Sequence, residues 1–500
     1  MVEVFFVFVH VFRNFIIHKL FVMSQSIVTS HNYINGKFVT SAQMHSVFQK
    51  YTGELLAKIP VATESQVEEA IQNAQKTFPV IKNFSAEKRA QILWSLYEQL
   101  HDRKEYFARL IAAEAGKPIS YARSEVNRAL DNLQTGIRAA LQFAGKQIPM
   151  DYLNGKGKTA YTIRQALGPV LGITPFNFPL NLALHKLIPA IAVGAPLILK
   201  PAPQAPLTLL AFARLLQNTE LPPGAVQILF TTNELAQKMV EDNRLKILSF
   251  TGSDKIGWFL KSKAGKKKVL LEMGGNAAAI IDQTADLKRA AKKLAYGSFL
   301  NAGQICISTQ RIFVLEEVFE SFINIFLNET AKIKSGDIFD EDVVNSSMIS
   351  ARDIQRTDEW VAEAVQQGAR ILSGGSVLDP QANIYAPTVL TDTRTGMKIY
   401  DNEAFAPVVM IEKIKTFKEG IARINESRYG LQAGVFSNDL KNLMTAQNEL
   451  EVGGVIVNDI PGFRIDSMPY GGIKDSGVGR EGGMYALNDF TEPKLIVWGT

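Results

Sequence analysis

Short apolar runs alternate with amphipathic segments along most of the chain. Apolar runs ended by Pro, Gly or polar residues predict strands at residues 170–174, 196–200, 226–230 and 247–251. Between them, apolar residues recur at helical spacing and predict helices, for example at residues 207–217 and 233–241. Short apolar strands that alternate with amphipathic helices are typical of βαβ units around a parallel sheet. The pattern therefore predicts an α/β fold.

The pattern continues on both sides of this region. It predicts a hairpin at residues 33–39, helices at 63–77 and 87–110, and strands at 277–281 and 311–314. The hairpin would turn at Asn35-Gly36, a pair that adopts the required left-handed backbone. Thr63 or Ser65 is expected to cap the first helix.

The first 22 residues differ from the rest because they consist mainly of Val, Phe and Ile. Polar residues interrupt them before any run reaches the ~18 apolar residues of a membrane helix. A signal peptide has a basic start and a small-residue cleavage site, and neither is present. We interpret this segment as translation from an upstream start, with Met23 opening the protein, and we treat residues 1–29 as an atypical extension. The alternative is a membrane anchor.

Composition narrows the class of protein. Hydrophobic residues make up 46% of the chain and charged residues 21%, which are ordinary globular values. The net charge of +5 is too small for its length to indicate a nucleic-acid partner, and no membrane partner is expected. The single cysteine forms no internal disulfide, and no Cys/His cluster predicts a metal site. A free thiol suits a reducing compartment, so we expect a cytoplasmic protein.

Two candidate binding segments follow predicted strands. Gly252 and Ser253 end one strand and start a helix, where free N–H groups attract phosphate. Lys200 ends another strand, at the edge where ligands of open α/β sheets bind. The alternatives are a structural turn and a solvated lysine.

Three further residues could carry chemistry. Cys306 lies among small residues and has room for a substrate, although an inert buried thiol is the alternative. No histidine follows it in the chain, so a Cys/His dyad would have to use a distant partner, most plausibly His185. Glu272 stands among apolar residues before two glycines, and burial would raise its pKa toward that of a general base. Asn177, between aromatic residues and prolines, could donate to an oxyanion or simply cap a turn.

These segments, taken in order over residues 30–500, resemble the NAD(P)-dependent aldehyde dehydrogenase superfamily. The resemblance is carried by residues 174–179, 199–201, 221–224, 249–253, 271–276, 301–306, 403–407 and 468–477. The spacing from Glu272 to Cys306 is also similar to that of the family. Residues 265–268 and 463–466 resemble the lactaldehyde dehydrogenase-like branch.

The resemblance implies a mechanism and a set of site residues. Cys306 would attack the aldehyde, Asn177 would hold the oxyanion, and Glu272 would activate the water that hydrolyses a thioester. Lys186 matches a lysine that the family often places near the active site. Cofactor contacts are implied for Thr174, Pro175, Lys200, Gly252, Ser253, Glu403 and Phe405.

Departures from the family pattern affect the expected cofactor. Pro203 stands where NAD-preferring members often have a glutamate that binds both ribose hydroxyls. Without that carboxylate the 2′-phosphate of NADP is not repelled, so we expect NADP or dual use of NADP and NAD. Residues 345–347, Asn-Ser-Ser, replace a common Gly-Pro and are expected to alter only a surface turn.

The resemblance also implies the architecture. We expect a Rossmann-like cofactor domain at residues 30–145 and 165–274 and an α/β catalytic domain at 275–480. Residues 146–164 and 484–500 would form a small β oligomerisation element. An exposed strand edge there predicts a homodimer or homotetramer.

The sequence is compatible with several functions. The leading one is oxidation of a small aldehyde to the carboxylic acid. A CoA-acylating dehydrogenase is the first alternative, although such relatives tend to lack the glutamate found at position 272. Others are a cofactor-independent thiol esterase and a scaffold without activity. Arg464, near the expected substrate entrance, either favours an anionic or hydroxylated substrate or forms a surface salt bridge.

Overall fold

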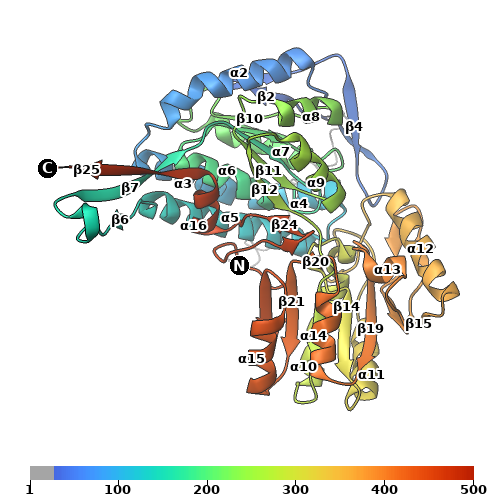
Figure 1. The fold of residues 1–500 in the computed structure, drawn as a ribbon. Coiled ribbons are helices and arrows are strands. Elements are labelled where there is room, and N and C mark those ends of the chain that lie inside the picture. The colour runs from blue at the N-terminus through green and yellow to red at the C-terminus, as the bar shows by residue number, and fades with distance from the viewer. Residues whose placement is uncertain (1–27, 500) are drawn as a thin grey trace, which may run out of the picture.

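The computed structural model describes residues 28–499 and contains two large sheets that lie one above the other in Figure 1. The first sheet has eight strands in the order β24-β12-β11-β8-β9-β10-β2-β3. Its centre is parallel, and β24, β2 and β3 join antiparallel at the edges. In that order the strands are Gly477–Val478, Lys268–Glu272, Ile247–Thr251, Val170–Ile173, Leu197–Lys200, Val226–Ile228, Asn32–Ile34 and Lys37–Val39.

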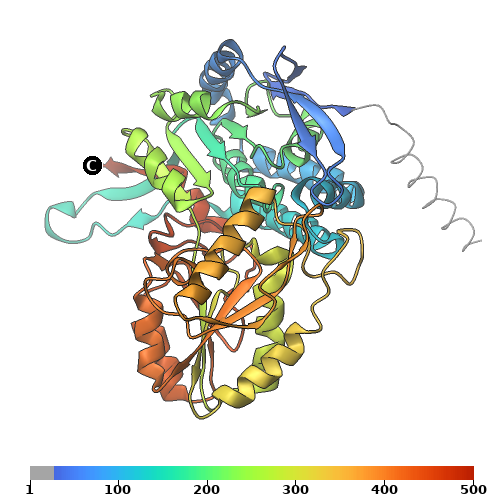
Figure 2. The ribbon, with the colours of Figure 1, turned by 90° about the vertical axis from the view of Figure 1, so that its right-hand side faces the viewer.

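The second sheet has seven strands in the order β15-β18-β19-β14-β13-β21-β22. Only β15 runs antiparallel to its neighbour. These strands are Arg370–Ser373, Thr388–Thr391, Val408–Ile414, Arg311–Leu315, Ala278–Ile281, Gln432–Phe436 and Gly454–Val457. Helices cover both faces of the second sheet in Figures 1 and 2, as parallel sheets require.

The helices of the first half include α2 (Glu64–Ile81), α3 (Ala86–Asp102), α4 (Lys104–Ala115), α5 (Ile119–Gln142), α6 (Asn181–Val193), α7 (Leu207–Gln217), α8 (Asn233–Glu241) and α9 (Asp254–Lys263). Those of the second half are α10 (Leu287–Phe299), α11 (Phe319–Thr330), α12 (Ala351–Gln366), α13 (Lys398–Asp401), α14 (Phe417–Asn425), α15 (Leu440–Glu449) and α16 (Gly483–Asp489), with 3-10 turns at Leu153–Gly155 and Leu300–Gly303. Thr63 caps α2, and its side chain forms a reciprocal capping box with Gln66.

A third sheet projects from the body of the molecule (Figure 2). In it β25 (Thr491–Trp498) pairs along its whole length with β7 (Thr159–Ala166), and β6 (Gln147–Ile148) pairs on the other side. Smaller sheets join β1 (Val28–Thr29), β5 (Leu55–Pro60) and β4 (Met44–Phe48); β16 (Val377–Asp379) and β17 (Ile384–Tyr385); and β20 (Tyr429–Gly430) and β23 (Ile473–Lys474). No helix within residues 28–499 is long and apolar enough to cross a membrane.

Three local predictions are wrong. The segment at residues 87–110 forms two helices because Arg103 leaves the helical conformation, with φ −115° and ψ 18°. The last two residues of the expected N-terminal extension, Val28 and Thr29, form β1 beside β5, while residues 1–27 lie outside the described part of the chain. Residues 345–347 are no surface turn, since all three side chains are fully buried.

Candidate active site

A cavity of about 580 Å³ lies where strands of the first sheet end and face the second sheet. β8, β9, β11 and β12 all deliver their carboxyl ends to it, which is the edge that binds ligands in open α/β sheets. The sequence-predicted residues among its lining are Thr174, Pro175, Asn177, Lys200, Gly252, Ser253, Glu272, Cys306, Glu403 and Phe405. The fold therefore brings together nearly the whole predicted site.

The loop that carries Cys306 has an unusual backbone. Asn301, Ala302 and Gly303 follow one another in the left-handed region, with φ of 55°, 54° and 66°. Such a run costs free energy at the two non-glycine residues, and strain of this kind concentrates at functional sites. A side chain at position 303 would place its Cβ 2.1 Å from the carbonyl oxygen of Ala406, so the loop also needs a glycine there.

The side chain of Gln304 holds the loop that carries Cys306 through three hydrogen bonds. Its side-chain Nε2 donates to the carbonyl oxygens of Asn301 and Ser347, both at 3.2 Å, and its Oε1 accepts from the N–H of Ile349 at 2.9 Å. Residues 345–347 are buried, and the Ser347 carbonyl holds Gln304 of the loop that carries Cys306, so this segment packs inside the fold and not at the surface. The Asn177 amide in turn donates to the Gln304 carbonyl at 2.9 Å, so one of its two N–H groups is already engaged.

Glu272 ends β12 in a buried position. Its side chain is 4% exposed, and Oε2 has no hydrogen-bond partner among the described residues. Burial, together with the negative charge of Glu481, raises the pKa of Glu272 well above its usual value. A carboxyl group with a free oxygen and a raised pKa, beside a cavity that also holds Cys306, has the properties of a general base.

Lys200 and Glu403 are buried groups that line the cavity. Lys200 is 4% exposed and pairs with no carboxylate in residues 28–499, so the alternative of a solvated lysine is wrong. Burial lowers the pKa of Lys200 to about 8 and raises the pKa of Glu403 to about 8. Glu403 accepts from the N–H of Gly275 at 3.1 Å, and any Cβ at Gly274 would meet its carboxylate. A buried ammonium donor and a buried carboxylate acceptor that line one cavity could bind the hydroxyl groups of a ligand.

The remaining cofactor residues also line the cavity. Ser253 precedes α9 as expected, but its side chain makes no capping hydrogen bond. Phe405 has φ of 48°, and its ring meets that of Phe176 edge to face at 5.8 Å. This strained aromatic residue lines the same cavity as Cys306 and presents a ring that suits stacking against a flat ligand.

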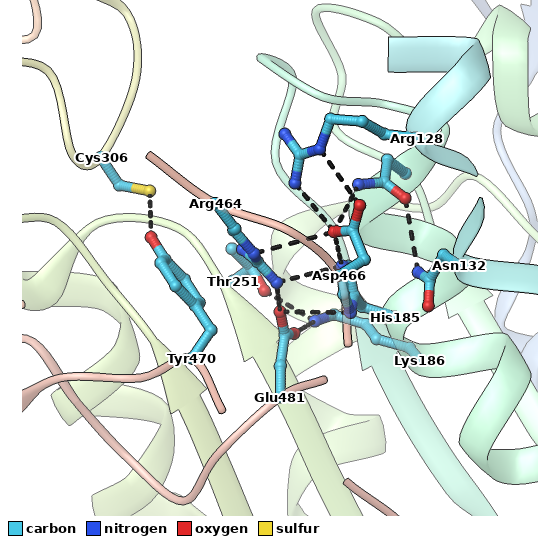
Figure 3. Close-up of polar contacts among 11 residues, drawn as sticks. Arg128, Asn132, His185, Lys186, Thr251, Cys306, Arg464, Asp466, Tyr470 and Glu481 are labelled. Atoms are coloured by element: carbon cyan, nitrogen blue, oxygen red, sulfur yellow. Dashed lines mark hydrogen bonds and ion pairs between the residues drawn. The ribbon is translucent and has the colours of Figure 1, made fainter. Parts of the chain in front are cut away.

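A buried polar cluster lies behind the reacting groups (Figure 3). Lys186 donates to the Thr251 hydroxyl at 2.6 Å and to Glu481 at 3.3 Å. Asp466 accepts from Arg128 at 2.8 and 3.1 Å and bonds His185 at 2.8 Å. The thiol of Cys306 instead contacts the hydroxyl of Tyr470 at 2.8 Å, so a Cys306–His185 dyad is not formed.

The sequence matches the model of one known protein family over most of its length. The Aldehyde dehydrogenase family matches residues 38–496. The 3-sulfolactaldehyde dehydrogenase of Priestia aryabhattai is 41% identical over 468 residues, which cover 93% of this chain and 97% of that protein. The chain belongs to the aldehyde dehydrogenase family.

Solved structures agree in fold. Aldehyde dehydrogenase 21 of Physcomitrella patens, in complex with the reaction product succinate, has a TM-score of 0.92 and 38% identity, covering 95% of this chain and 99% of that one. Glyceraldehyde-3-phosphate dehydrogenase GapN of Methanocaldococcus jannaschii, complexed with NADP, has a TM-score of 0.88 and 34% identity, covering 92% and 100%. Further relatives, 34% and 36% identical, are lactaldehyde dehydrogenases. The predicted family, branch, fold class and use of NAD(P) are thereby confirmed.

In this aldehyde dehydrogenase Arg464 is no surface residue. Its side chain is 5% exposed and lies among His185, Asp466 and Glu481, at 3.0, 3.7 and 3.4 Å from the nearest atoms. The alternative of a surface salt bridge is therefore wrong. Its Nε is buried without a hydrogen-bond partner in the described chain, so the guanidinium is incompletely satisfied.

The charges of this cluster do not balance. Arg128, Arg464 and Lys186 face two carboxylates, those of Asp466 and Glu481. Burial acts against ionisation of both acids, but the hydrogen bond with His185 and the nearby guanidinium groups hold the pKa of Asp466 below its usual range, and Lys186 does the same for Glu481.

The neighbouring titratable groups do not restore the balance. Burial lowers the pKa of His185, so its imidazole is neutral, and the raised pKa of Glu272 favours the neutral acid. With Glu272 neutral, the three cations exceed the two carboxylates by one charge, and ionisation of Glu272 balances them.

Most residues of this buried polar cluster carry no local sequence signal that predicts a role. Tyr470 lies within residues 468–477, which carried the family resemblance, but its contact with Cys306 depends on the fold. Arg128 and Asp466 are 338 positions apart, and no local pattern connects them. The one available signal was the density of charged residues at 464–466 and 480–481 in otherwise apolar or glycine-rich surroundings.

Proposed function

We propose that this protein oxidises a small aldehyde bearing an anionic group to the carboxylic acid, with NADP or NAD as the acceptor and Cys306 as the nucleophile. The observation that carries the proposal is the cluster in which Arg128, Arg464 and Lys186 outnumber the carboxylates of Asp466 and Glu481, and which Tyr470 connects to the Cys306 thiol. An uncompensated buried cation is costly, and an anionic substrate removes that cost on binding.

The names of the relatives support this choice of substrate. Sulfolactaldehyde, in the name of the Priestia enzyme, carries a sulfonate. Succinate, the product bound in the Physcomitrella structure, carries a second carboxylate beyond the one formed by oxidation. Both are small molecules with an anionic group a few atoms from the reacting carbon, and one buried arginine cluster suits either of them.

The first half of the proposed reaction uses Cys306 and Asn177. Burial raises the pKa of the Cys306 thiol to about 11, so a base must accept its proton, and Glu272, whose Oε2 has no hydrogen-bond partner among the described residues, can accept it in its ionised form. The sulfur then attacks the aldehyde carbon and forms a thiohemiacetal. The second N–H of the Asn177 amide and the backbone N–H of Cys306 would hold the oxyanion, each donor contributing ~3–4 kcal/mol.

The second half yields the acid. When bound, the nicotinamide supplies the acceptor for the hydride that leaves the thiohemiacetal carbon. Lys200 and Glu403 would hold the ribose hydroxyls, Phe405 would support the ring, and Thr174, Pro175, Gly252 and Ser253 would line the phosphate side. After releasing the thiol proton to solvent, Glu272 would take a proton from the water that attacks the thioester carbon, and Cys306 would leave as the thiolate while the acid forms. The presence of Glu272 favours water over CoA as the acyl acceptor.

The predicted preference for NADP leads to a first test. Pro203 lines the cavity beside Ala202 and Gln204. Pro203→Glu places a carboxylate where it would accept from both ribose hydroxyls and repel a 2′-phosphate. We expect the ratio of kcat/KM for NADP to that for NAD to fall by about 10-fold or more, since like charges in contact cost several kcal/mol.

Pro203→Gln is the matched control because it has the same length without the charge. The NADP/NAD ratio of this variant should stay near that of the unmodified protein. If both variants change the ratio equally, charge repulsion at position 203 does not set the cofactor preference.

We also propose that the third sheet mediates self-association into a homodimer or homotetramer. β25 is an edge strand, and its side chains Leu495, Val497 and Trp498 are 57%, 47% and 61% exposed. An apolar edge of this kind is normally covered by another chain.

The proposed function is tested by following the reduction of NADP and NAD with matched aldehydes. Succinate semialdehyde and sulfolactaldehyde should be oxidised far faster than butanal and lactaldehyde, which lack the anionic group. We expect the product of each reaction to be the carboxylic acid. Equal rates for charged and neutral aldehydes would contradict the proposed substrate class, and activity without any nicotinamide would favour the esterase alternative.

A further inference from the structure

Tyr470 connects the catalytic thiol to the buried cation cluster. Its hydroxyl lies 2.8 Å from the Sγ of Cys306, and the Cζ of Arg464 lies 3.6 Å from the centre of its ring (Figure 3). The side chain is 3% exposed. Thiol, phenol and guanidinium thus form a continuous stack from the reacting atom to the charge.

The backbone fixes the phenol in this place. The N–H of Tyr470 donates to the carbonyl of Glu481 at 3.0 Å, and the N–H of Glu481 donates back at 2.7 Å. The side chain of Glu481 also accepts from Arg464 at 3.4 Å. Because one residue pairs with both the main chain of Tyr470 and the cation on its ring, the hydroxyl is aimed at the sulfur before any substrate arrives.

The charges around the thiol decide which group donates. Glu272, Glu403 and Tyr121 also face Cys306, and the two carboxyl groups oppose formation of a thiolate. Burial raises the pKa of Tyr470 well above its usual value, so the phenol keeps its proton. A protonated phenol donates to a thiolate, and a cation on the face of its ring polarises the O–H bond further.

We propose that Tyr470 is a positioning residue whose hydroxyl stabilises and orients the Cys306 thiolate, with Arg464 holding and polarising the phenol. The importance of this contact for turnover rests on the proposed role of Cys306 as nucleophile. The contact itself is tested without substrate.

Alkylation of the thiol by iodoacetamide reports the thiolate directly. Cys306 is the single cysteine of the chain, so the mass of the intact protein measures its reaction alone. In the absence of aldehyde and nicotinamide, we expect Tyr470→Phe to move the pH of half-maximal alkylation rate upward by about one unit. Below that pH the rate should fall about tenfold. The plateau rate at high pH should not fall, which separates a changed thiolate population from blocked access.

Tyr385→Phe is the matched control. Tyr385 is also a fully buried tyrosine whose hydroxyl donates to an acid, Asp358, but it lies in the second half of the molecule. Its replacement should leave the alkylation profile of Cys306 unchanged. Arg464→Lys provides a second variant, and a shift in the same direction is expected because a lysine cannot stack as a flat cation.

An unchanged pH profile in folded Tyr470→Phe would overturn the proposal, and so would an equal shift in Tyr385→Phe. If Tyr470→Phe does not fold, the profile of Arg464→Lys decides. Because the assay contains neither aldehyde nor NADP, a wrong substrate assignment leaves its outcome unaffected. A protein that oxidises anionic aldehydes but shows no alkylation shift would refute only the role of Tyr470.

Discussion

Cys306→Ala is expected to abolish oxidation of every aldehyde that the protein accepts, with kcat falling by at least about 10⁴-fold. The reason is that Cys306 is the single cysteine of the chain, and the strained loop at 301–303 precedes it at the cavity. The measurement is the initial rate of NADPH formation. Binding of NADP, measured by calorimetry, should persist because the Lys200 and Glu403 groups remain.

Cys306→Ser separates the loss of the nucleophile from the loss of side-chain volume. Serine keeps the size and the hydrogen bond with Tyr470 but is a far weaker nucleophile, so its activity should also be lost. Normal turnover by either variant would show that the thiol is not the reacting group.

Glu272→Gln is expected to separate the two halves of the reaction. Hydrolysis should slow by about 10²–10⁴-fold, since the amide cannot accept a proton from water. If another group can deprotonate the thiol, each protein molecule should form close to one NADPH and then stop, with the acyl group left on Cys306. The intact mass of the protein should increase by that acyl group, which identifies the thioester.

The pH dependence of hydrolysis gives the same assignment a second check. The raised pKa of Glu272 means that the carboxylate form appears only as the pH rises through this raised value. The rate of hydrolysis should therefore increase with pH over that range, and Glu272→Gln should lack this increase. Glu412→Gln is the control, because Glu412 is another buried carboxyl group whose pKa burial raises, to about 7, but it lies away from the cavity.

Much of the fold could be predicted because local sequence and tertiary packing agree there. The helices at 207–217 and 233–241 begin and end where the pattern placed them, and the Asn35-Gly36 turn adopts left-handed φ values of 51° and 76°. Candidate site residues at strand ends, such as Lys200 and Glu272, could be found because parallel strands deliver their carboxyl ends to one edge.

Other features depend on contacts that no local pattern encodes. Arg103 lies in an unbroken amphipathic stretch, yet the chain turns there so that α3 and α4 can both pack against α5. Residues 345–347 are polar and suggested a surface turn, but the Ser347 carbonyl accepts from Gln304 and the Ser346 hydroxyl donates to the Gly116 carbonyl inside the fold. The charge cluster joins residues from α5, α6 and the segment after β22, so only the folded chain shows that its charges do not balance.

Replacement of Arg464 tests whether buried positive charge selects an anionic aldehyde. The measurement is the ratio of kcat/KM for succinate semialdehyde to that for butanal, which has the same carbon chain without the carboxylate. We expect Arg464→Gln to lower this ratio by about 30-fold or more while butanal oxidation continues, and Arg464→Lys to retain part of the preference. An unchanged ratio in Arg464→Gln would show that the buried charge does not select the substrate.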